Sequence, residues 1–479
     1  MKDETPGLGS AERFESVRAG RVRRTVPVVG FAARAAGGRV VAGLRSRAGD
    51  TEAVDRFHDR TAQRYANMLG HSKGVLMKAG QLLSTYDVDP DVGGPLATYQ
   101  AALQRLQSDA PPMDFATARE VIESDLGRPV EEMFVEFSSE PIAAASIGQV
   151  HRARLADGRD VAVKVQYPGV ARAIRDDLAN TELLATFLKL GMSLTPRAMR
   201  TDQRSAAAEV AERIADELDY RHEARSIRRF ADLYRGHPFI RVPDVIDSHS
   251  GDLVIAMTFL DGVGWAQART ADQELRNQWA TAISYFGFGA YRHSNLFNAD
   301  PHPGNYRFGE DGTVGFVDFG CVKQFPEWVR RGIVTMFRAT CEGDRHELYR
   351  LMIDHGFVAA DTDLSVDDAY QWWAMMASSV NTEQPHTFVP ADSTGLVQSM
   401  FDDGPIGTAV RKMQIPSDYV MLARINLGIN AILSELGATL DTREQLDCLD
   451  GLGTPTTPAS RAHTAWASRR GLPFGLTPR

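Results

Sequence analysis

The sequence contains only three cysteines among its 479 residues: Cys321, Cys341 and Cys448. They are too few and too scattered for a disulfide framework or a cysteine-rich zinc site, so we expect a reducing compartment. The longest uncharged apolar stretches, Asn277 to Tyr291 and Tyr370 to Thr382, are shorter than the roughly 20 residues that cross a bilayer. The sequence therefore predicts no transmembrane helix.

The chain also lacks the basic excess of a nucleic-acid binder. It has 53 lysines and arginines against 62 aspartates and glutamates, a net charge of −9. A domain that follows nucleic-acid phosphates is usually basic, so no nucleic-acid partner is expected. The opening Met1-Lys2-Asp3-Glu4 does not resemble a secretion signal, and the cytoplasm is the expected location.

One local exception is the segment from Ser16 to Ala48, which contains eight arginines and no acidic residue. Apolar residues alternate with these charges, a pattern that suits the surface of an anionic membrane. A flexible basic arm explains the pattern equally well, while the acidic opening disfavours a transit peptide. An anionic membrane surface or lipid therefore remains a candidate partner.

The apolar spacing predicts helices across 55–106, and strand signals begin further along the chain. Asp157-Gly158, between two β-prone runs, predicts a hairpin, and Asp311-Gly312 predicts a second one. A further strand is expected at Leu253 to Phe259. From Gly451 onward the chain is rich in Gly, Pro, Thr and Ser, which predicts a mobile tail.

The strongest functional signal is the run from Asn298 to Asn305, which a Val-Asp-Phe-Gly sequence follows. Asp300 and Asn305 are five positions apart, as are Asp and Asn in the kinase catalytic loop, and Asp318 begins Asp-Phe-Gly. Carboxylate and amide oxygens are ligands that Mg²⁺ accepts beside phosphates. Phosphoryl transfer needs mainly charge neutralisation and alignment from a protein, so this set predicts that chemistry.

A lysine and a run of small residues precede this signal. Lys164 ends Val-Ala-Val-Lys on an otherwise apolar strand, and such a lysine can project its ammonium group into a pocket. The small residues upstream would let backbone N–H groups approach a polyphosphate. Either feature alone is ambiguous, but their order along the chain matches that of a kinase. The candidate nucleotide-binding residues are Ala143, Ala144, Ala145, Ser146, Gly148, Val150 and Lys164.

A buried kinase lysine needs a carboxylate on a facing helix. The stretch from Asp216 to Glu223 predicts an acidic helix with two spaced glutamates, Glu217 and Glu223, and one of them should pair with Lys164. By contrast, Lys78-Ala79-Gly80-Gln81 has no role on physical grounds alone, because Lys and Gln on such a helix ordinarily face solvent.

Together these motifs resemble the UbiB-like atypical kinases, also called AarF-domain kinases, of coenzyme Q biosynthesis. The resemblance covers about Asp55 to Leu440. It implies an α+β, two-lobed protein-kinase-like fold with a helical N-terminal extension, and Mg²⁺ with ATP or ADP as cofactors. The motifs that carry it are Lys78-Ala79-Gly80-Gln81, Ala143 to His151, Val161 to Gly169, Glu217-Leu218-Asp219-Tyr220, and the set Asp300, Asn305 and Asp318.

The resemblance also implies roles for single residues. Lys164 is the implied nucleotide lysine, Glu223 its ion-pair partner, and Asn305 and Asp318 the implied metal ligands. Asp300 takes the position of the catalytic aspartate. The alanine-rich segment implies altered nucleotide handling, with protein phosphorylation suppressed in favour of ATPase or small-molecule work.

The same resemblance gives the Lys-x-Gly-Gln segment a meaning. It implies that Lys78 and Gln81 fold over the active site, with Lys78 near Glu217 and Asp219, an arrangement that would occlude a protein substrate. The units expected are a basic, flexible segment at 1–50, a helical extension at 51–112, a kinase-like N-lobe with a helical insertion at 113–262, a helical C-lobe at 263–440 and a flexible tail at 441–479.

The sequence departs from the kinase pattern at three points. Asn298 replaces the histidine of the catalytic loop, and Lys164 and Glu223 stand 59 positions apart, which fits an insertion of extra helices. The paired hydrophobic C-terminal spans of bacterial relatives have no counterpart, because the stretch from Met421 to Leu436 carries two charged residues. Any membrane contact is therefore expected to be peripheral.

The expected function is that of an atypical kinase or ATPase that hydrolyses ATP or phosphorylates a small or lipid acceptor. By analogy it would support isoprenoid quinone or related lipid metabolism, with quinone-biosynthesis proteins as candidate partners. A nucleotide-gated scaffold with negligible turnover stays open, as does an antibiotic-type phosphotransferase. His302 is expected to shape its loop, and the Trp-rich run at Trp372-Trp373 to pack its helix, in preference to binding a ligand.

Overall fold

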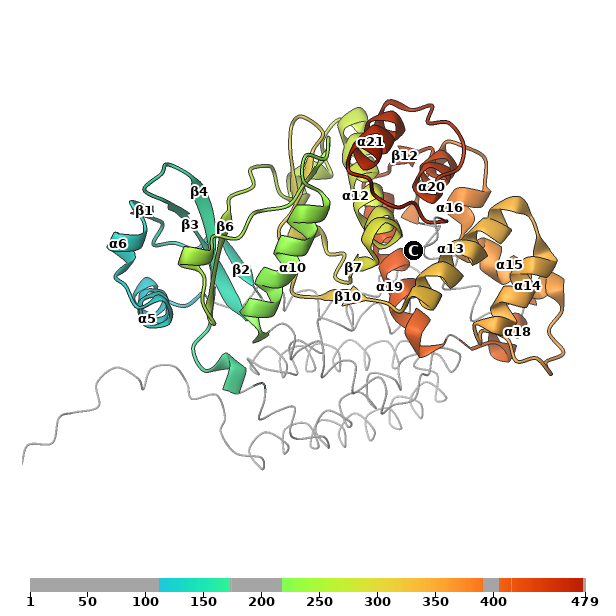
Figure 1. Cartoon of the computed structure of the whole chain (residues 1–479), viewed down its shortest axis with the longest axis horizontal. Helices are drawn as coiled ribbons and strands as arrows, with labels where there is room; N and C mark the ends of the chain where they lie inside the picture. The colour runs from blue at the N-terminus through green and yellow to red at the C-terminus, as the bar shows by residue number, and fades with distance from the viewer. Residues whose placement is uncertain are drawn as a thin grey trace, which may run out of the picture.

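A computed structural model describes residues 112–145, 147–172, 174, 218–390, 405–414 and 416–476. It shows a mixed α+β molecule with a smaller lobe built around one sheet and a larger, mainly helical lobe (Figure 1). The predicted basic segment and helical extension lie outside the described residues. So do four of the predicted site residues, Lys78, Gln81, Ser146 and Glu217.

The smaller lobe contains an antiparallel sheet in which β3, β4 and β6 lie side by side. The short strands β1 and β2 both pair with the outer edge of β3. The turn at Asp157-Gly158 joins β3 to β4 as predicted, and β6 confirms the predicted third strand. The strands are β1 (Glu136–Phe137), β2 (Ala143–Ala145), β3 (Gly148–Arg154), β4 (Asp160–Gln166) and β6 (Val254–Thr258).

The residues of β4 alternate between the two faces of the sheet, as an extended strand requires. Its alternate valines pack on one face against α5 (Phe115–Leu126) and α6 (Val130–Met133). Lys164 lies between two of these valines and therefore points to the other face, where it meets α10 (Tyr220–Leu233). The strand thus directs a single charged group into the interior between the lobes.

Side-chain caps set the ends of these helices. Asp114 precedes α5 and accepts a hydrogen bond from the backbone N–H of Thr117 at 2.8 Å. Gly127 ends α5 with a φ of 70°, a left-handed conformation that favours glycine. Asp219 caps α10 in the same way, accepting from the backbone N–H of His222 at 2.8 Å.

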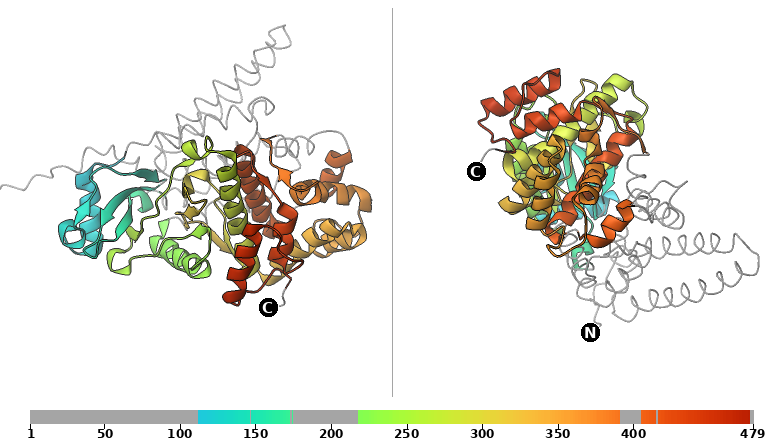
Figure 2. Two further views of the ribbon diagram at one scale, coloured as in Figure 1. Left: turned by 90° about the horizontal axis from the view of Figure 1, so that it is seen from above. Right: turned by 90° about the vertical axis from the view of Figure 1, so that its right-hand side faces the viewer.

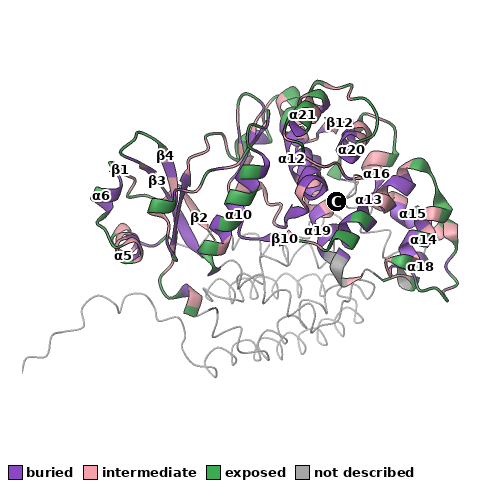
Figure 3. Ribbon diagram, in the orientation of Figure 1, coloured by how far each residue is buried: buried purple, intermediate pink, exposed green. Residues whose placement is uncertain are grey.

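The larger lobe is built around α12 (Gln273–Ser294), which lies in the main hydrophobic core. Figure 3 shows buried residues concentrated along this helix and along the strands of the sheet. None of the helices among the described residues combines the length and apolarity that a membrane crossing requires. The other helices of the larger lobe before residue 441 are α11 (Trp265–Ala268), α13 (Glu327–Glu342), α14 (Arg345–Asp354), α15 (Val366–Met376), α16 (Ser378–Asn381), α18 (Pro405–Lys412) and α19 (Ser417–Glu435).

Short strands and 3-10 turns complete this lobe. The hairpin predicted at Asp311-Gly312 is confirmed, because β8 and β9 pair across it, and β5 joins β9 in parallel. A second pair, β7 with β10, lies beside the predicted catalytic motifs. The elements are β5 (Ile240–Arg241), β7 (Leu296–Asn298), η3 (Pro303–Asn305), β8 (Tyr306–Phe308), β9 (Val314–Phe316), β10 (Val322–Gln324), β11 (His386–Thr387) and β12 (Thr439–Leu440). A further 3-10 turn, η2 (Asp247–His249), lies beside β6 in the smaller lobe.

The prediction of a flexible tail from residue 441 is wrong. This segment forms α20 (Thr442–Asp450) and α21 (Pro458–Arg469), and the C-terminal part lies against the larger lobe (Figure 2). The Gly, Pro and Thr residues that suggested mobility are helix boundaries. Gly451 ends α20 with a φ of 81°, and Thr457 caps α21 through its side chain.

Candidate functional site

Two carboxylates that are far apart in the sequence, those of Glu223 and Asp318, converge on the ammonium group of Lys164. Its Nζ donates to both carboxylate oxygens of Glu223, at 2.8 and 2.9 Å, and to Oδ2 of Asp318 at 3.2 Å. The side chains of Lys164 and Glu223 are only 9% and 1% exposed. The predicted pairing of Lys164 with a glutamate of the acidic helix is therefore present, and Glu223 is the partner.

Burial and charge act in opposite directions on this cluster. Burial alone would lower the pKa of Lys164, but Asp318 and Glu223 outweigh it and hold that pKa well above its ordinary value. Burial raises the pKa of Glu223 to about 7, and Asp318 adds to this against the attraction of Lys164. Lys164 therefore keeps its positive charge at neutral pH, as a group that binds phosphate oxygens must.

The small-residue segment upstream forms a β-hairpin. Ala143, Ala144 and Ala145 form β2 and pair in register with β3, with Ala143 opposite Val150 and Ala145 opposite Gly148. This pairing bonds part of the alanine backbone to β3, and the other edge of β2 pairs with no strand among the described residues. The segment nevertheless lies one strand from Lys164, because Val150 is also the cross-strand neighbour of Lys164.

Asp300 and Asn305 are joined directly. The side-chain amide of Asn305 donates to the backbone carbonyl of Asp300 at 3.3 Å and to its Oδ2 at 3.1 Å. Between them, Nδ1 of His302 accepts a hydrogen bond from the backbone N–H of Gly304 at 3.1 Å. That contact supports the predicted loop-shaping role of this histidine.

Asn298 connects the two acidic motifs, a role that sequence reasoning missed. Its Nδ2 donates to the backbone carbonyl of Asp318 at 2.9 Å, and its Oδ1 accepts from the backbone N–H of Asp300 at 3.2 Å. The sequence analysis identified this residue only as a replacement for the kinase histidine. Its position two residues before Asp300 was the available signal, but the bridge to Asp318 depends on the pairing of β7 with β10.

The Asp-Phe-Gly motif is anchored at each of its residues. Oδ1 of Asp318 accepts from the backbone N–H of Gly320 at 3.0 Å. The fully buried ring of Phe319 lies 5.0 Å from that of Phe230, measured between centroids. Phe230 belongs to α10, so the helix that carries Glu223 also packs against the motif that carries Asp318.

Asp318 and Asn305 carry the side-chain oxygen atoms that could bind a divalent cation. The amide nitrogen of Asn305 is engaged with Asp300, so its oxygen is the atom that can act as a ligand. Among the described residues, no group of three or more His, Cys, Asp or Glu side chains could hold a metal. A carboxylate and an amide that work together with phosphate oxygens are a different kind of site, and their chemistry fits Mg²⁺.

Lys78, which is predicted to contact Asp219, lies outside the described residues. Asp219 itself is about half exposed, caps α10 and lies 3.5 Å from Arg225, measured from Oδ2 to Nη2. The structure therefore gives this carboxylate a helix-capping contact, and its predicted contact with Lys78 stays a prediction.

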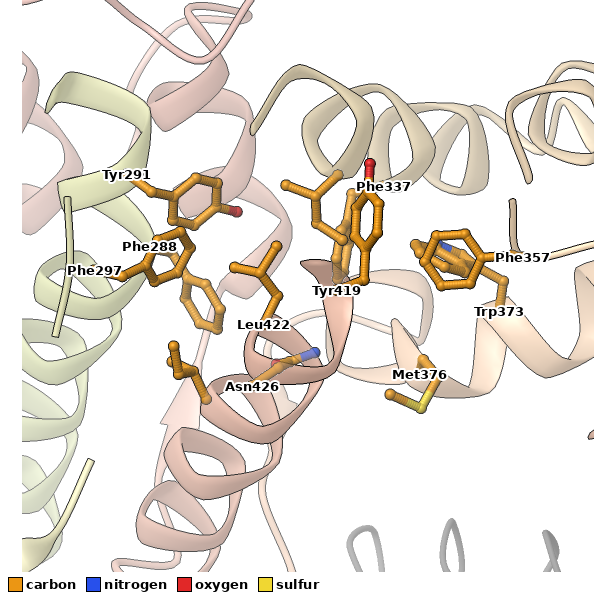
Figure 4. Close-up of a pocket in the computed structure, with 12 residues that line it drawn as sticks. Phe288, Tyr291, Phe297, Phe337, Phe357, Trp373, Met376, Tyr419, Leu422 and Asn426 are labelled. Atoms are coloured by element: carbon orange, nitrogen blue, oxygen red, sulfur yellow. The ribbon is translucent and has the colours of Figure 1, made fainter. Parts of the chain in front are cut away.

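An apolar pocket lies among helices of the larger lobe (Figure 4). None of its lining residues belongs to the cluster around Lys164. Trp373 of the Trp-rich run is buried and meets Phe357 edge-on, with ring centroids 5.4 Å apart. Trp373 thus packs against its neighbours and also lines the pocket, so the choice of packing over ligand binding stays a prediction. The lining residues include Phe288, Tyr291, Phe337, Phe357, Trp373, Met376, Tyr419, Leu422 and Asn426.

A family model described as the ABC1 atypical kinase-like domain matches residues 105–352, more than half of the chain. The chain belongs to this family. The matched region contains every residue of the Lys164 cluster and both acidic motifs. The predicted resemblance to the UbiB-like atypical kinases is thereby confirmed.

Curated relatives support the ABC1 assignment. The chain is 33% identical over 308 residues to the Arabidopsis thaliana chloroplastic protein ACTIVITY OF BC1 COMPLEX KINASE 1, covering 64% of this chain and 44% of that protein. It is 29% identical over 407 residues to the Danio rerio mitochondrial atypical kinase COQ8B, covering 84% and 62%. The chain thus spans less than two thirds of the length of these relatives.

A solved structure agrees with the fold. The Rv3197–erythromycin complex from Mycobacterium tuberculosis is similar with a TM-score of 0.59 and 30% sequence identity, over 83% of this chain and 97% of that one. Together with the ABC1 domain, this likeness confirms the predicted α+β kinase-like fold.

Proposed function

We propose that this protein binds ATP with Mg²⁺ and either hydrolyses it or phosphorylates a small or lipid acceptor. The observation that supports this best is the simultaneous contact of Lys164 with Glu223 and Asp318. A lysine held by two carboxylates has a fixed position and a permanent charge. Phosphoryl transfer relies on charge that is positioned before the reaction begins.

In this proposal Lys164 binds phosphate oxygens of ATP or ADP beneath the β2–β3 hairpin. The small side chains of Ala143 and Ala145 allow a nucleotide to approach the hairpin backbone. Gly148 on β3 allows the strand to pack closely against Val165 and Tyr220. The alanines also make the hairpin stiffer than a glycine-rich loop, because their backbone conformations are fewer.

Asp318 and Asn305 would hold Mg²⁺, which neutralises charge on the phosphates when it is bound. The protein orients both ligands in advance. The backbone N–H of Gly320 and the ammonium of Lys164 fix the carboxylate of Asp318. The carboxylate of Asp300 fixes the amide of Asn305.

Asp300 would orient the attacking water or the acceptor hydroxyl and accept its proton. Its backbone N–H is bonded to Asn298, and its Oδ2 to Asn305. Both contacts limit the rotation of the carboxylate. A group that must meet a hydroxyl in line with the leaving phosphate needs that restriction.

The acceptor is proposed to belong to isoprenoid quinone or related lipid metabolism, on the basis of membership in the ABC1 family. Lys78 and Gln81, with Glu217 and Asp219, are proposed to cover the site and exclude protein substrates. The arginine-rich segment at 16–48 is the proposed contact with an anionic membrane, from the cytoplasmic side.

The first test is Mg²⁺-dependent phosphate release from ATP by the purified full chain, with and without anionic liposomes. Asp318→Asn should lower the rate by about 100-fold or more, because one positioned charge commonly contributes that much. Asp361→Asn is the matched control, since this aspartate is exposed in a turn of the larger lobe. Its rate should equal that of the unmodified protein.

A rise in phosphate release with liposomes would support a membrane-associated acceptor. Release that is equal in the protein and in Asp318→Asn would contradict the proposed hydrolysis. If Mg²⁺-dependent nucleotide binding survived in that case without any turnover, the protein would be a nucleotide-gated scaffold.

A further inference from the structure

The C-terminal helix α21 contacts the far end of the helix that carries Glu223. Nε1 of Trp466 donates to the backbone carbonyl of Arg235 at 3.1 Å. The guanidinium of Arg470, just after α21, donates to the same carbonyl at 3.2 Å and to that of Asp232 at 2.8 Å. The last carbonyls of a helix have no partner within it, and a cation is favourable there. These contacts therefore cap α10 from outside.

Aromatic rings also pack across this contact. The rings of Trp466 and Tyr234 are stacked, with centroids 5.7 Å apart and planes within 7°. The ring of His237 stands edge-on to Trp466 at 4.4 Å. Trp466 is only 1% exposed, so the end of α10 and α21 share one buried interface.

A chain of three buried histidines adds to that interface. Nδ1 of His237 accepts from the backbone N–H of Ile240 at 3.1 Å, so its proton lies on Nε2, which meets Nδ1 of His463 at 3.0 Å. Nε2 of His463 then donates to Nε2 of His293 at 3.0 Å, and Nδ1 of His293 donates to the carbonyl of Pro473 at 2.7 Å. The backbone groups at the two ends assign one tautomer to every ring.

The position of α10 matters because Glu223 lies in its first turn and Tyr234 at its end. A helix of this length moves as a rigid element, so a shift at its end also displaces the carboxylate at its start. Tyr234 is tied to α12 as well, since its hydroxyl donates to the carbonyl of Phe286 at 3.1 Å. Trp466 and Arg470 add the contacts that the C-terminal segment makes with this end of α10.

We propose that Trp466 and Arg470 are positioning residues that hold the end of α10 so that Glu223 stays against Lys164. The consequence for ATP turnover rests on the proposed function. The anchoring of α10 itself does not, so the two ideas can fail separately.

The test compares the full chain with the double variant Trp466→Phe/Arg470→Ala. Phenylalanine keeps the stacking partner of Tyr234, so the variant removes the three hydrogen bonds with little loss of packing. Arg469→Ala is the matched control, because it removes an exposed arginine in the last turn of the same helix. Arg470→Lys, combined with Trp466→Phe, returns a cation to the same carbonyls.

Hydrogen exchange of the amides of α10 gives the first readout. The double variant should raise their exchange rate by about tenfold or more, because the three hydrogen bonds that hold the end of α10 are lost. Exchange in α14 should not change, Arg469→Ala should match the unmodified protein, and the lysine variant should recover part of the protection.

ATP turnover gives the second readout, measured with and without Glu223→Gln. The double variant should lower turnover by about tenfold in the unmodified background and by much less in the Glu223→Gln background, as expected for coupled sites. Equal losses in both backgrounds, or unchanged exchange in α10, would overturn the proposal. If the unmodified protein turned over no ATP, the exchange result alone would decide the anchoring and the proposed function would have failed independently.

Discussion

Gly148 occupies the point where the β2–β3 hairpin comes closest to β4. A Cβ atom at this position would lie 2.3 Å from the backbone carbonyl oxygen of Val165 and 2.8 Å from the hydroxyl of Tyr220. Neither a backbone oxygen nor a buried tyrosine can move away freely. The absence of a side chain is therefore required by packing, in addition to any role in nucleotide approach.

Gly148→Ala should destabilise the protein by about 1–3 kcal/mol, the usual range for overpacking a tight site. It should also weaken nucleotide binding, because the hairpin must move away from β4 and Lys164. Thermal unfolding and Mg²⁺-ATP titration measure the two effects.

Gly264→Ala is the control for this substitution. Its φ of −84° suits any residue, and a Cβ added there meets nothing within 4 Å. Stability should stay within about 0.5 kcal/mol of the unmodified protein. An equally mild effect of Gly148→Ala would show that the hairpin adapts and that the close approach is not a constraint.

At the level of helices and strands, the sequence predicted those elements that local patterns determine. The two Asp-Gly turns and the lysine on an apolar strand follow from short-range rules. It was predictable that Lys164 pairs with a carboxylate, because a buried ammonium group needs a counter-charge. The choice of Glu223 over Glu217 did not follow from this rule, since it depends on how α10 packs; it was implied by the resemblance to the UbiB-like kinases, and the structure has Glu223 as the partner.

Other features depend on contacts that sequence spacing does not reveal. The C-terminal helices were missed because their boundary residues, Gly451 and Thr457, look like those of a loop, while their stability comes from burial of Trp466 and Asp450. The bridging role of Asn298 depends on strand pairing. Both features were missed because they depend on packing between residues far apart in the sequence.

The ion pair between Arg292 on α12 and Asp450 on α20 illustrates that packing. Nε of Arg292 donates to Oδ1 of Asp450 at 2.6 Å, and the two side chains are 1% and 0% exposed. Arg330 extends the cluster by donating to the carbonyl of Gly475 at 2.9 Å. The C-terminal segment is therefore fixed by charges that water does not reach.

Asp450→Asn should lower the free energy of unfolding by about 3–5 kcal/mol, because it leaves the buried guanidinium of Arg292 without its counter-charge. Chemical denaturation measures this value. Arg292→Met/Asp450→Leu should cost less than the single change, since the guanidinium of Arg292 is removed together with its counter-charge. A single variant as stable as the unmodified protein would contradict the view that this pair anchors α20.

For the whole molecule, the three-histidine chain makes stability depend on pH. Burial lowers the pKa of His237 and of His463 well below the ordinary value of 6.5. The groups that face them are the guanidinium of Arg241, the ring of Tyr285, stacked at 4.2 Å on His463, and His293. None of the described groups that shift these two pKa values is a carboxylate, so a proton on His237 or His463 gains no counter-charge from them.

The sign follows from proton counting. Below pH 6.5 the unfolded chain protonates both histidines while the folded protein does not, so stability is complete above that pH and decreases as the pH falls. Each histidine should contribute a slope of about 1.4 kcal/mol per pH unit. Thermal unfolding between pH 7 and 5 should show this slope, and His463→Gln should reduce it, whereas His346→Gln, at an exposed position, should not. Identical slopes in all three proteins would mean that the histidine chain accepts protons without loss of the fold.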